Sequence, residues 1–293
     1  MRCVGACGLV AQCDEYQLVA DKGISLVILP TIQYDSKISD FIRTNKFLVT
    51  ARYPTNTFQS QVRKVINSSK TLIPPDTKWK YANMNQTAPT IKGLIKLHKP
   101  EHTIRPVVNW RGAPAYKLAR LFTQKIRQLA PLPNTYNLEN TTDLLTKLKN
   151  TPILPQFNMA SLDITNLYTN IPVTETREII TKALENNIPN PQIRDELINW
   201  YDTITTQNYL SNNGKIMIQK EGLAMGAPTS GLIAEFFLQN LENIHLAHIA
   251  EKHKITGYFR YIDDILLIYD SDHTNIQDIA NDFNTTPQPE IHN

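Results

Sequence analysis

The chain has 293 residues, of which 41% are hydrophobic and 19% are charged, a composition typical of globular proteins. Its formal net charge of +3 does not by itself predict a polyanionic partner, although it permits one where cations cluster. No apolar run approaches the roughly 18 residues of a membrane span, and no signal-peptide pattern opens the chain. We therefore expect a soluble, intracellular protein of one or two domains with no membrane partner.

Residues 1–22 differ in composition from the rest of the chain, and we expect them to form a poorly ordered leader. All three cysteines, Cys3, Cys7 and Cys13, lie in this segment. The first histidine is His98, so a four-ligand zinc site cannot be completed locally. Free thiols are the expectation, with a zinc ligand from a distant part of the fold as the alternative.

The first half of the remaining chain alternates apolar runs with polar connectors. Its expected elements are a strand over residues 23–30, a helical or mixed segment over 35–50, a connector over 71–90, a cationic hairpin over 91–110 with its bend at 99–103, and helices over 113–130 and 138–150. The strand that follows, within residues 157–172, is expected to end near Asp163.

The second half adds helices and two hairpins. Its expected elements are helices over 174–187 and 190–206, a hairpin around Asn213-Gly214 and a long amphipathic helix over 231–252. Thr174 and Asn190 are plausible N-caps, as is Thr229 or Ser230 for the long helix. Because hairpins interleave with helices, we expect an α+β fold with an antiparallel sheet.

The stretch RYIDDILLIY, residues 260–269, places two aspartates within an apolar run. Strands over 259–262 and 265–269 would leave Asp263 and Asp264 as a two-residue turn that brings both carboxylates to one tip. Their mutual repulsion beside an apolar hairpin would be removed by a divalent cation. The alternative is that Asp-Asp is simply good turn chemistry.

A third carboxylate, Asp163, lies at the end of its own strand. If that strand lies beside the aspartate hairpin, three carboxylates converge at one edge of the sheet. This is the arrangement that holds two divalent cations about 3.5–4 Å apart for an in-line displacement at phosphorus. Hard cations such as magnesium prefer these oxygen ligands.

Four motifs in a fixed order carry a family resemblance. They are LIKLHKPEHTIRPVV, SLDITNLYTNIP, NGKIMIQKEGLAMGAPTSGLIAEFFLQNLE and FRYIDDILLIY, within about residues 26–270. The chain resembles the reverse transcriptases, most closely those of Penelope-like retroelements. The resemblance implies a right-hand polymerase with an antiparallel palm sheet packed on helices. The expected parts are an N-terminal extension over 23–75 and a reverse transcriptase domain over 76–293, with fingers over about 76–150 and palm over about 151–293.

The family usually continues with a further palm strand, a thumb and an endonuclease. We therefore expect a C-terminally truncated domain with the thumb absent and with an unpaired edge beside the aspartate hairpin. The resemblance also implies the roles of the aspartates. Asp163, Asp263 and Asp264 would be catalytic and would bind two Mg²⁺ ions, or Mn²⁺, together with the backbone carbonyl of Ile164.

The resemblance implies nucleotide-binding residues as well. Tyr168 would lie under the sugar of the incoming nucleotide and select dNTP over NTP; the alternative is a core tyrosine with a satisfied hydroxyl. The small or rigid Gly226, Ala227 and Pro228 would let the backbone approach a base or nucleotide, and the same residues also suit a loop before a helix. The remaining candidates are cations: Lys96 and Arg105 for the triphosphate, and His98, Lys99, Arg111 and Lys117 for the nucleic-acid backbone. The alternative for these cations is a solvated surface.

The implied function is that of an RNA-directed DNA polymerase. A DNA primer 3′-hydroxyl would attack the α-phosphate of a dNTP on an RNA template, and the family resemblance implies a nuclear location. One alternative is a catalytically silent retroelement remnant that at most binds nucleic acid. Others are an RNA-templated RNA polymerase, against which Tyr168 argues, and a two-metal nuclease, against which the motif order argues. The oligomeric state stays open.

Overall fold

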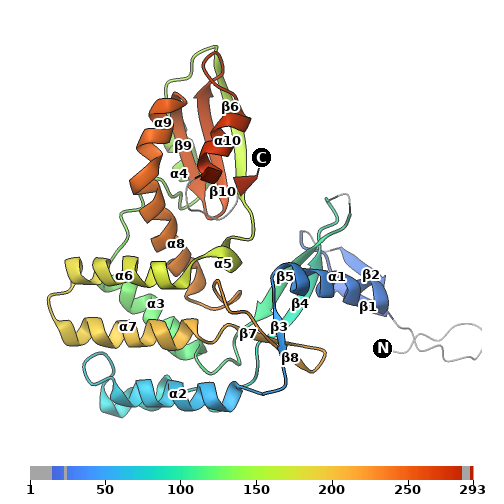
Figure 1. Ribbon diagram of the computed structural model, residues 1–293, viewed down its shortest axis with the longest axis vertical. Coiled ribbons are helices and arrows are strands. Elements are labelled where there is room, and N and C mark those ends of the chain that lie inside the picture. Colours follow the sequence, from blue (N-terminus) through green and yellow to red (C-terminus); the bar gives the residue numbers. More distant parts are fainter. Residues whose placement is uncertain (1–14, 23–24, 100, 286–290, 293) are drawn as a thin grey trace, which may run out of the picture. The chain divides into compact units, whose positions relative to one another are not determined.

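The computed structural model describes residues 15–22, 25–99, 101–285 and 291–292. The chain folds into two compact units, each assembled from three segments. The first unit contains Met1–Thr55, Asn85–Ala113 and Tyr209–Lys220, and the second contains Asn56–Met84, Pro114–Asn208 and Glu221–Asn293. Figure 1 shows the elements of both units. The three cysteines of the expected leader lie outside the described residues.

The first unit contains a five-stranded sheet in the order β3-β8-β7-β4-β5 and a two-stranded sheet, β1-β2. Its elements are β1 (Glu15–Val19), β2 (Leu26–Pro30), α1 (Thr31–Thr44), β3 (Leu48–Thr50), β4 (Thr90–Ile95), β5 (Ile104–Asn109), β7 (Tyr209–Asn212) and β8 (Lys215–Ile218). The strand pairs are antiparallel except for a single parallel pair between β4 and β7. Residues 15–19, which we placed in the leader, form β1.

Two hairpins expected in this unit are confirmed. β4 and β5 pair antiparallel over their whole length, with Ile91 and Ile95 buried on one face. β7 and β8 are joined by Asn213 and Gly214, which have φ values of 47° and 76°. Positive φ at both positions is what the two-residue hairpin turn of type I′ requires, and asparagine and glycine tolerate it.

The second unit packs helices against a four-stranded antiparallel sheet in the order β11-β6-β10-β9. The strands are β6 (Phe157–Ile164), β9 (Ile255–Tyr261), β10 (Asp264–Asp270) and β11 (Ile291–His292). The helices are α2 (Thr55–Ser68), the 3₁₀-helix η1 (Pro75–Lys80), α3 (Tyr116–Leu129), α4 (Thr141–Lys149), α5 (Leu167–Asn170), α6 (Val173–Asn187), α7 (Pro191–Thr205), α8 (Ser230–Leu241), the π-helix η2 (Glu242–Leu246), α9 (Ala247–Lys252) and α10 (Ile276–Thr285). None of the described helices combines the length and the apolar character needed to cross a bilayer.

The sheet of the second unit has a different cover on each face. On one face, Ile164, Tyr258 and Ile265 share a small cavity with side chains of α8, η2 and α10. On the other face, Leu138 and two leucines of α4 pack with Phe259 and Ile268. The strands are thus buried by the alternation of their side chains, which is the pattern of an antiparallel sheet between helices.

The predicted helix N-caps of this unit are confirmed in part. Asn190 caps α7 by accepting a hydrogen bond from the Gln192 N–H, as expected. Thr174 does not cap α6, because that helix already begins at Val173, directly after Pro172. Thr229 holds the N-cap position of α8 without a side-chain hydrogen bond.

The long helix expected over 231–252 is confirmed as a continuous helical run, but it differs from the expectation in two respects. It is divided into α8, the π-helical segment η2 and α9. In addition, α8 is not amphipathic, because its buried residues lie on nearly every side. A helix that is apolar all round belongs in a core, and here it forms the centre of the second unit.

We also expected an unpaired strand edge beside the aspartate hairpin. This prediction is wrong at the position of Asp163. β6 pairs with β10 on one side and with β11 on the other. β11 lies opposite Ile164 and Asp163 on β6. The backbone of β6 therefore has a partner strand on both sides at the position of Asp163.

Candidate active site

The register of β6 and β10 brings two of the predicted aspartates together. Asp163 lies directly opposite Asp264 in the antiparallel pair, and both side chains are exposed. The neighbouring pair is Ile164 and Asp263, in which the Ile164 N–H donates to the Asp263 carbonyl at 2.9 Å. Because hydrogen-bonded and non-hydrogen-bonded pairs alternate, Asp163 and Asp264 form a non-hydrogen-bonded pair, with Cα atoms about 4.5 Å apart and side chains on one face.

The turn of this hairpin is displaced by one residue from our expectation. The two turn residues are Ile262 and Asp263, and Asp264 is the first residue of β10, opposite Tyr261. Ile262 has a φ of 59°, a left-handed conformation that is costly for a β-branched side chain. The prediction of an Asp-Asp turn relied on aspartate tolerating turns, whereas here the strand pairing to β6 includes Asp264.

Asp263 lies close to Tyr168 of α5. Burial raises the pKa of the Tyr168 phenol, and the charges of Asp263 and Glu235 raise it further. The phenol oxygen also lies near the first turn of α8, since a Cβ added to Gly231 would be 4.0 Å from it. The half-buried ring thus lies between α8 and the hairpin turn. The two interpretations of Tyr168, a sugar gate and a core tyrosine, both stay predictions.

The loop before α8 is held against α5. The Leu223 N–H donates to the Tyr168 carbonyl at 2.7 Å, and a Cβ on Gly222 would lie only 2.3 Å from the Thr169 carbonyl oxygen. Only glycine fits at that position, which also has a φ of 77°.

The three predicted loop residues follow in the same segment. Gly226 is exposed and has a φ of 78°. Ala227 and Pro228 are half-buried, and the Thr123 hydroxyl donates to the Pro228 carbonyl at 3.2 Å. The hydroxyl of Ser230 closes the loop by donating to the Ala224 carbonyl at 2.6 Å. The loop is therefore fixed by main-chain contacts and presents small residues at its exposed end.

The aspartates fit a divalent cation only in part. Asp163 and Asp264 offer two carboxylates side by side. They supply the oxygen donors that Mg²⁺ and Mn²⁺ prefer. However, in the described part of the chain no three Asp, Glu, His or Cys side chains are grouped closely enough to hold a metal ion. The role of Asp163, Asp263 and Asp264 as a joint set of metal ligands therefore stays a prediction.

The predicted triphosphate-binding cations lie on one face of the β4–β5 hairpin in the first unit. Leu94 is opposite Arg105, and Lys96 follows two positions later on the same face. Sequence reasoning missed the partner of the arginine: Arg105 Nε donates to Asp21 Oδ1 at 3.0 Å. The Asp21 side chain is 1% exposed and that of Arg105 is 55% exposed, so a buried carboxylate holds an exposed guanidinium.

The predicted nucleic-acid contacts are divided between the units. His98, Lys99 and Arg111 are exposed in the first unit. Lys117 belongs to the second unit, where its ammonium group donates to the Ala82 carbonyl at 3.1 Å. These roles stay predictions.

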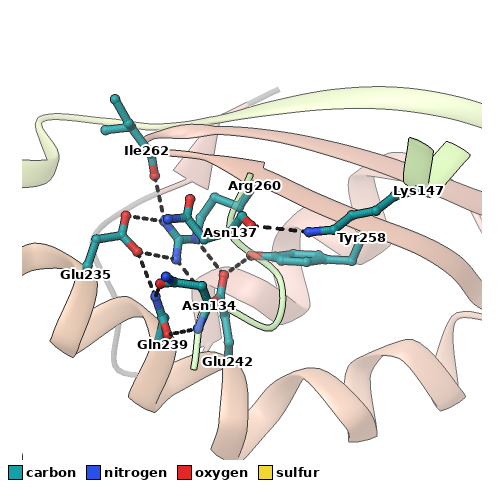
Figure 2. A network of polar contacts seen from close by, with 9 residues as sticks. All are labelled: Asn134, Asn137, Lys147, Glu235, Gln239, Glu242, Tyr258, Arg260 and Ile262. Carbon is teal, nitrogen blue, oxygen red and sulfur yellow. Dashed lines mark hydrogen bonds and ion pairs between the residues drawn. The ribbon is translucent and has the colours of Figure 1, made fainter. Parts of the chain in front are cut away.

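A buried arginine next to the site was also missed. Arg260 of β9 lies between two glutamates of the α8–η2 segment, Glu235 and Glu242, as Figure 2 shows. Two signals in the sequence could have indicated it. An arginine within an apolar strand requires buried acceptors. The two glutamates are seven positions apart, which places them on one side of a helix.

Comparisons with known proteins address the family. Residues 97–287 match the family described as reverse transcriptase (RNA-dependent DNA polymerase). A comparison with curated protein sequences gives no match.

Among solved structures, telomerase from Candida albicans in complex with a fragment of telomeric RNA matches with a TM-score of 0.54 and 12% identity, over 93% of this chain and 47% of that one. The corresponding complex from Candida tropicalis matches with a TM-score of 0.59 and 10% identity, over 92% of this chain and 44% of that one. At these identities the similarity concerns the fold, and the chain spans about half the length of the telomerase chains. Since the family match covers more than half of its residues, the chain belongs to the reverse transcriptase (RNA-dependent DNA polymerase) family.

Proposed function

We propose that this chain is the RNA-directed DNA polymerase domain of a Penelope-like retroelement and that it extends a DNA primer on an RNA template with dNTPs. The observation that carries the proposal is the register of β6 and β10, which sets Asp163 opposite Asp264 in a member of this family. The four motifs in their fixed order support the retroelement subfamily. The sheet of the second unit would be the palm, and the β4–β5 hairpin would belong to the fingers. A missing thumb stays a prediction, as does the nuclear location.

In this proposal the carboxylates of Asp163, Asp263 and Asp264 would hold the divalent cations. When bound, these ions would lower the pKa of the primer 3′-hydroxyl and neutralise the leaving pyrophosphate. The protein's own residues would position the nucleotide and exclude ribonucleotides. Tyr168 would bar a 2′-hydroxyl, and the exposed end of the Gly226 loop would let a nucleotide approach the backbone. Lys96 and Arg105 would bind the triphosphate, arginine as a planar fork and lysine as a point charge.

Primer extension tests the proposal. The assay uses purified protein, an RNA template with an annealed DNA primer, dNTPs and Mg²⁺. Loss of even an outer-shell partner of a metal site lowers activity about 10–100-fold, so we expect Asp163→Asn or Asp264→Asn to lower it by at least about 100-fold. Asp195→Asn, an exposed position on α7, is the matched control and should leave the rate unchanged.

The silent-remnant alternative gives a different result. In that case the wild-type protein and Asp163→Asn extend the primer equally poorly, while both retain salt-dependent binding to the primer–template. Extension that proceeds equally well with rNTPs as with dNTPs would instead indicate an RNA polymerase.

A further inference from the structure

The guanidinium of Arg260 uses every one of its N–H groups inside the second unit. Its side chain is fully buried. Nε donates to Glu242 Oε1 at 2.6 Å, and Nη2 donates to Glu242 Oε2 at 3.2 Å and to Glu235 Oε2 at 3.0 Å. Nη1 donates to Glu235 Oε1 at 2.8 Å and to the Ile262 carbonyl at 3.1 Å. These five bonds exhaust the five donors of an arginine.

Each of the two glutamate carboxylates also accepts a hydrogen bond from a residue other than Arg260 (Figure 2). The Tyr258 hydroxyl donates to Glu242 at 2.9 Å, and the Gln239 amide donates to Glu235 at 3.2 Å. Burial alone would lower the pKa of Arg260, but its hydrogen bonds to both glutamates outweigh burial and raise it. The arginine therefore stays charged, and the orientation of its plane is determined by two bidentate pairs.

The fifth hydrogen bond connects this network to the hairpin turn. Its acceptor is the carbonyl of Ile262, the turn residue with a φ of 59°. A left-handed φ is costly for a β-branched isoleucine, so contacts from elsewhere must stabilise this turn. Arg260 is also fixed through its main chain, because its N–H donates to Tyr136 and its carbonyl accepts from Leu138. The turn thus rests on a side chain that cannot shift without breaking several other bonds.

The network also approaches the tyrosine on the other side of the site. Burial raises the pKa of Tyr168, and the charges of Asp263 and Glu235 raise it further. Glu235 lies one helical turn after Gly231, beside which the Tyr168 hydroxyl is located. One carboxylate therefore contacts Arg260 and lies close to the predicted sugar gate.

Fold stability alone does not account for this arrangement. Removing two carboxylates and a guanidinium from water is unfavourable, and buried ion triads can often be replaced by uncharged residues without loss of stability. What an uncharged replacement cannot supply is a rigid donor to the Ile262 carbonyl. We propose that Arg260, held by Glu235 and Glu242, is a positioning residue that fixes the Ile262–Asp263 turn and thereby the placement of Asp263 and Asp264 for divalent-cation binding. This inference rests on the proposed polymerase function.

The experiment compares Arg260→Lys with Arg177→Lys. Lysine keeps the charge but lacks the planar fork. Arg177 makes a bidentate pair with Asp202 between α6 and α7 and has no bond to the turn, so it is the matched control. Three properties are measured on the whole chain: Mn²⁺ binding by electron paramagnetic resonance, hydrogen exchange of the amides of residues 262–264, and the Mg²⁺ concentration at half-maximal primer extension.

We expect Arg260→Lys to weaken Mn²⁺ binding and to raise the half-maximal Mg²⁺ concentration about 10–100-fold, the usual effect of losing an outer-shell support of a metal site. Exchange at residues 262–264 should become faster by a similar factor, while KM for dNTP stays near that of the wild type. Arg177→Lys should change none of these. Equal Mn²⁺ affinity and equal exchange rates in the two variants would overturn the inference.

A second variant covers the case in which Arg260→Lys does not fold. The combined Glu235→Gln, Arg260→Met and Glu242→Gln variant carries no buried charge at these positions and should unfold close to the wild-type temperature. It should still show weakened Mn²⁺ binding and faster exchange at the turn. Wild-type Mn²⁺ affinity in this variant would refute a positioning role. If the wild type itself extends no primer, the proposed function fails, whereas exchange and Mn²⁺ binding still test the role of Arg260.

Discussion

Two tight hairpin turns in the described part of the chain are built in opposite ways. The β7–β8 turn uses Asn213 and Gly214, both with positive φ, so its local chemistry suffices. The β9–β10 turn uses Ile262 and Asp263, and its isoleucine has a φ of 59°. There Arg260 donates to the Ile262 carbonyl from within a buried ion triad, and in our proposal this contact maintains the turn. A structural turn can be encoded by two residues, whereas the turn that carries a predicted catalytic carboxylate depends on distant parts of the chain.

The largest effect should come from removing the arginine alone. Arg260→Met leaves the Glu235 and Glu242 carboxylates buried without a counter-charge, which should destabilise the fold by about 3–5 kcal/mol. Denaturant unfolding followed by circular dichroism measures this change. The Glu235→Gln, Arg260→Met and Glu242→Gln combination should recover most of the loss. If the single variant unfolds like the wild type, the two buried carboxylates do not need the charge of Arg260.

Tyr168, which lies beside the Ile262–Asp263 turn, should control the selection of dNTP over rNTP. Tyr168→Ala removes the ring next to Asp263, and we expect the preference for dNTP over rNTP to fall about 10–100-fold, the usual range for a pocket that discriminates by shape. The ratio of kcat/KM values for the two nucleotides in primer extension measures it. Tyr258→Phe is the control, because the buried Tyr258 ring belongs to the Arg260 network and does not border the loop before α8. An unchanged ratio for Tyr168→Ala would refute the gate.

The structural turn should tolerate change at moderate cost. In Gly214→Ala the added Cβ meets nothing within 4 Å, so only the left-handed backbone opposes the substitution. We expect a loss of about 1 kcal/mol in the free energy of unfolding, with the rate of primer extension unchanged. Gly222→Ala is a useful contrast, because its Cβ would lie 2.3 Å from a backbone carbonyl and its loss should be clearly larger. Equal losses would mean that the close contact at Gly222 relaxes freely.

The smallest effect should come from giving the functional turn a more suitable residue. Asparagine accepts a left-handed conformation, so Ile262→Asn should change stability by less than about 1 kcal/mol, and in the stabilising direction. Combined with Arg260→Lys, it should reduce the destabilisation caused by the lysine. A double-mutant cycle in denaturant unfolding measures this coupling. Strict additivity would show that the arginine and the turn conformation are independent.

Much of the fold was predictable because its signals are local. The Asn213-Gly214 hairpin, the cationic β4–β5 hairpin and the Asn190 cap follow from short patterns, and the structure confirms each. The approach of Asp163 to Asp264 was predicted on the assumption that β6 and β10 are neighbours, and their pairing confirms it. The family resemblance, more than periodicity, made that assumption reasonable.

The remaining features depend on contacts between residues far apart in sequence. The register of β10 on β6 decides that Asp264 belongs to the strand, so the turn is displaced by one residue from our expectation. Similarly, Arg105 finds Asp21 and Arg260 finds Glu235, pairs separated by 84 and 25 positions. No local pattern specifies such partners.

The π-helical segment η2, which begins at Glu242, has a consequence for how this region can evolve. A π turn contains one residue more than an α turn, so the helix after it is rotated by about 100° relative to an uninterrupted α-helix. Removing one exposed residue there, such as Ile244, would leave Glu242 in place but would turn Ile249 of α9 out of the core. The single extra residue thus sets the rotation of α9 relative to α8. The part of the helix that pairs with Arg260 and the part that packs in the core can therefore face different directions.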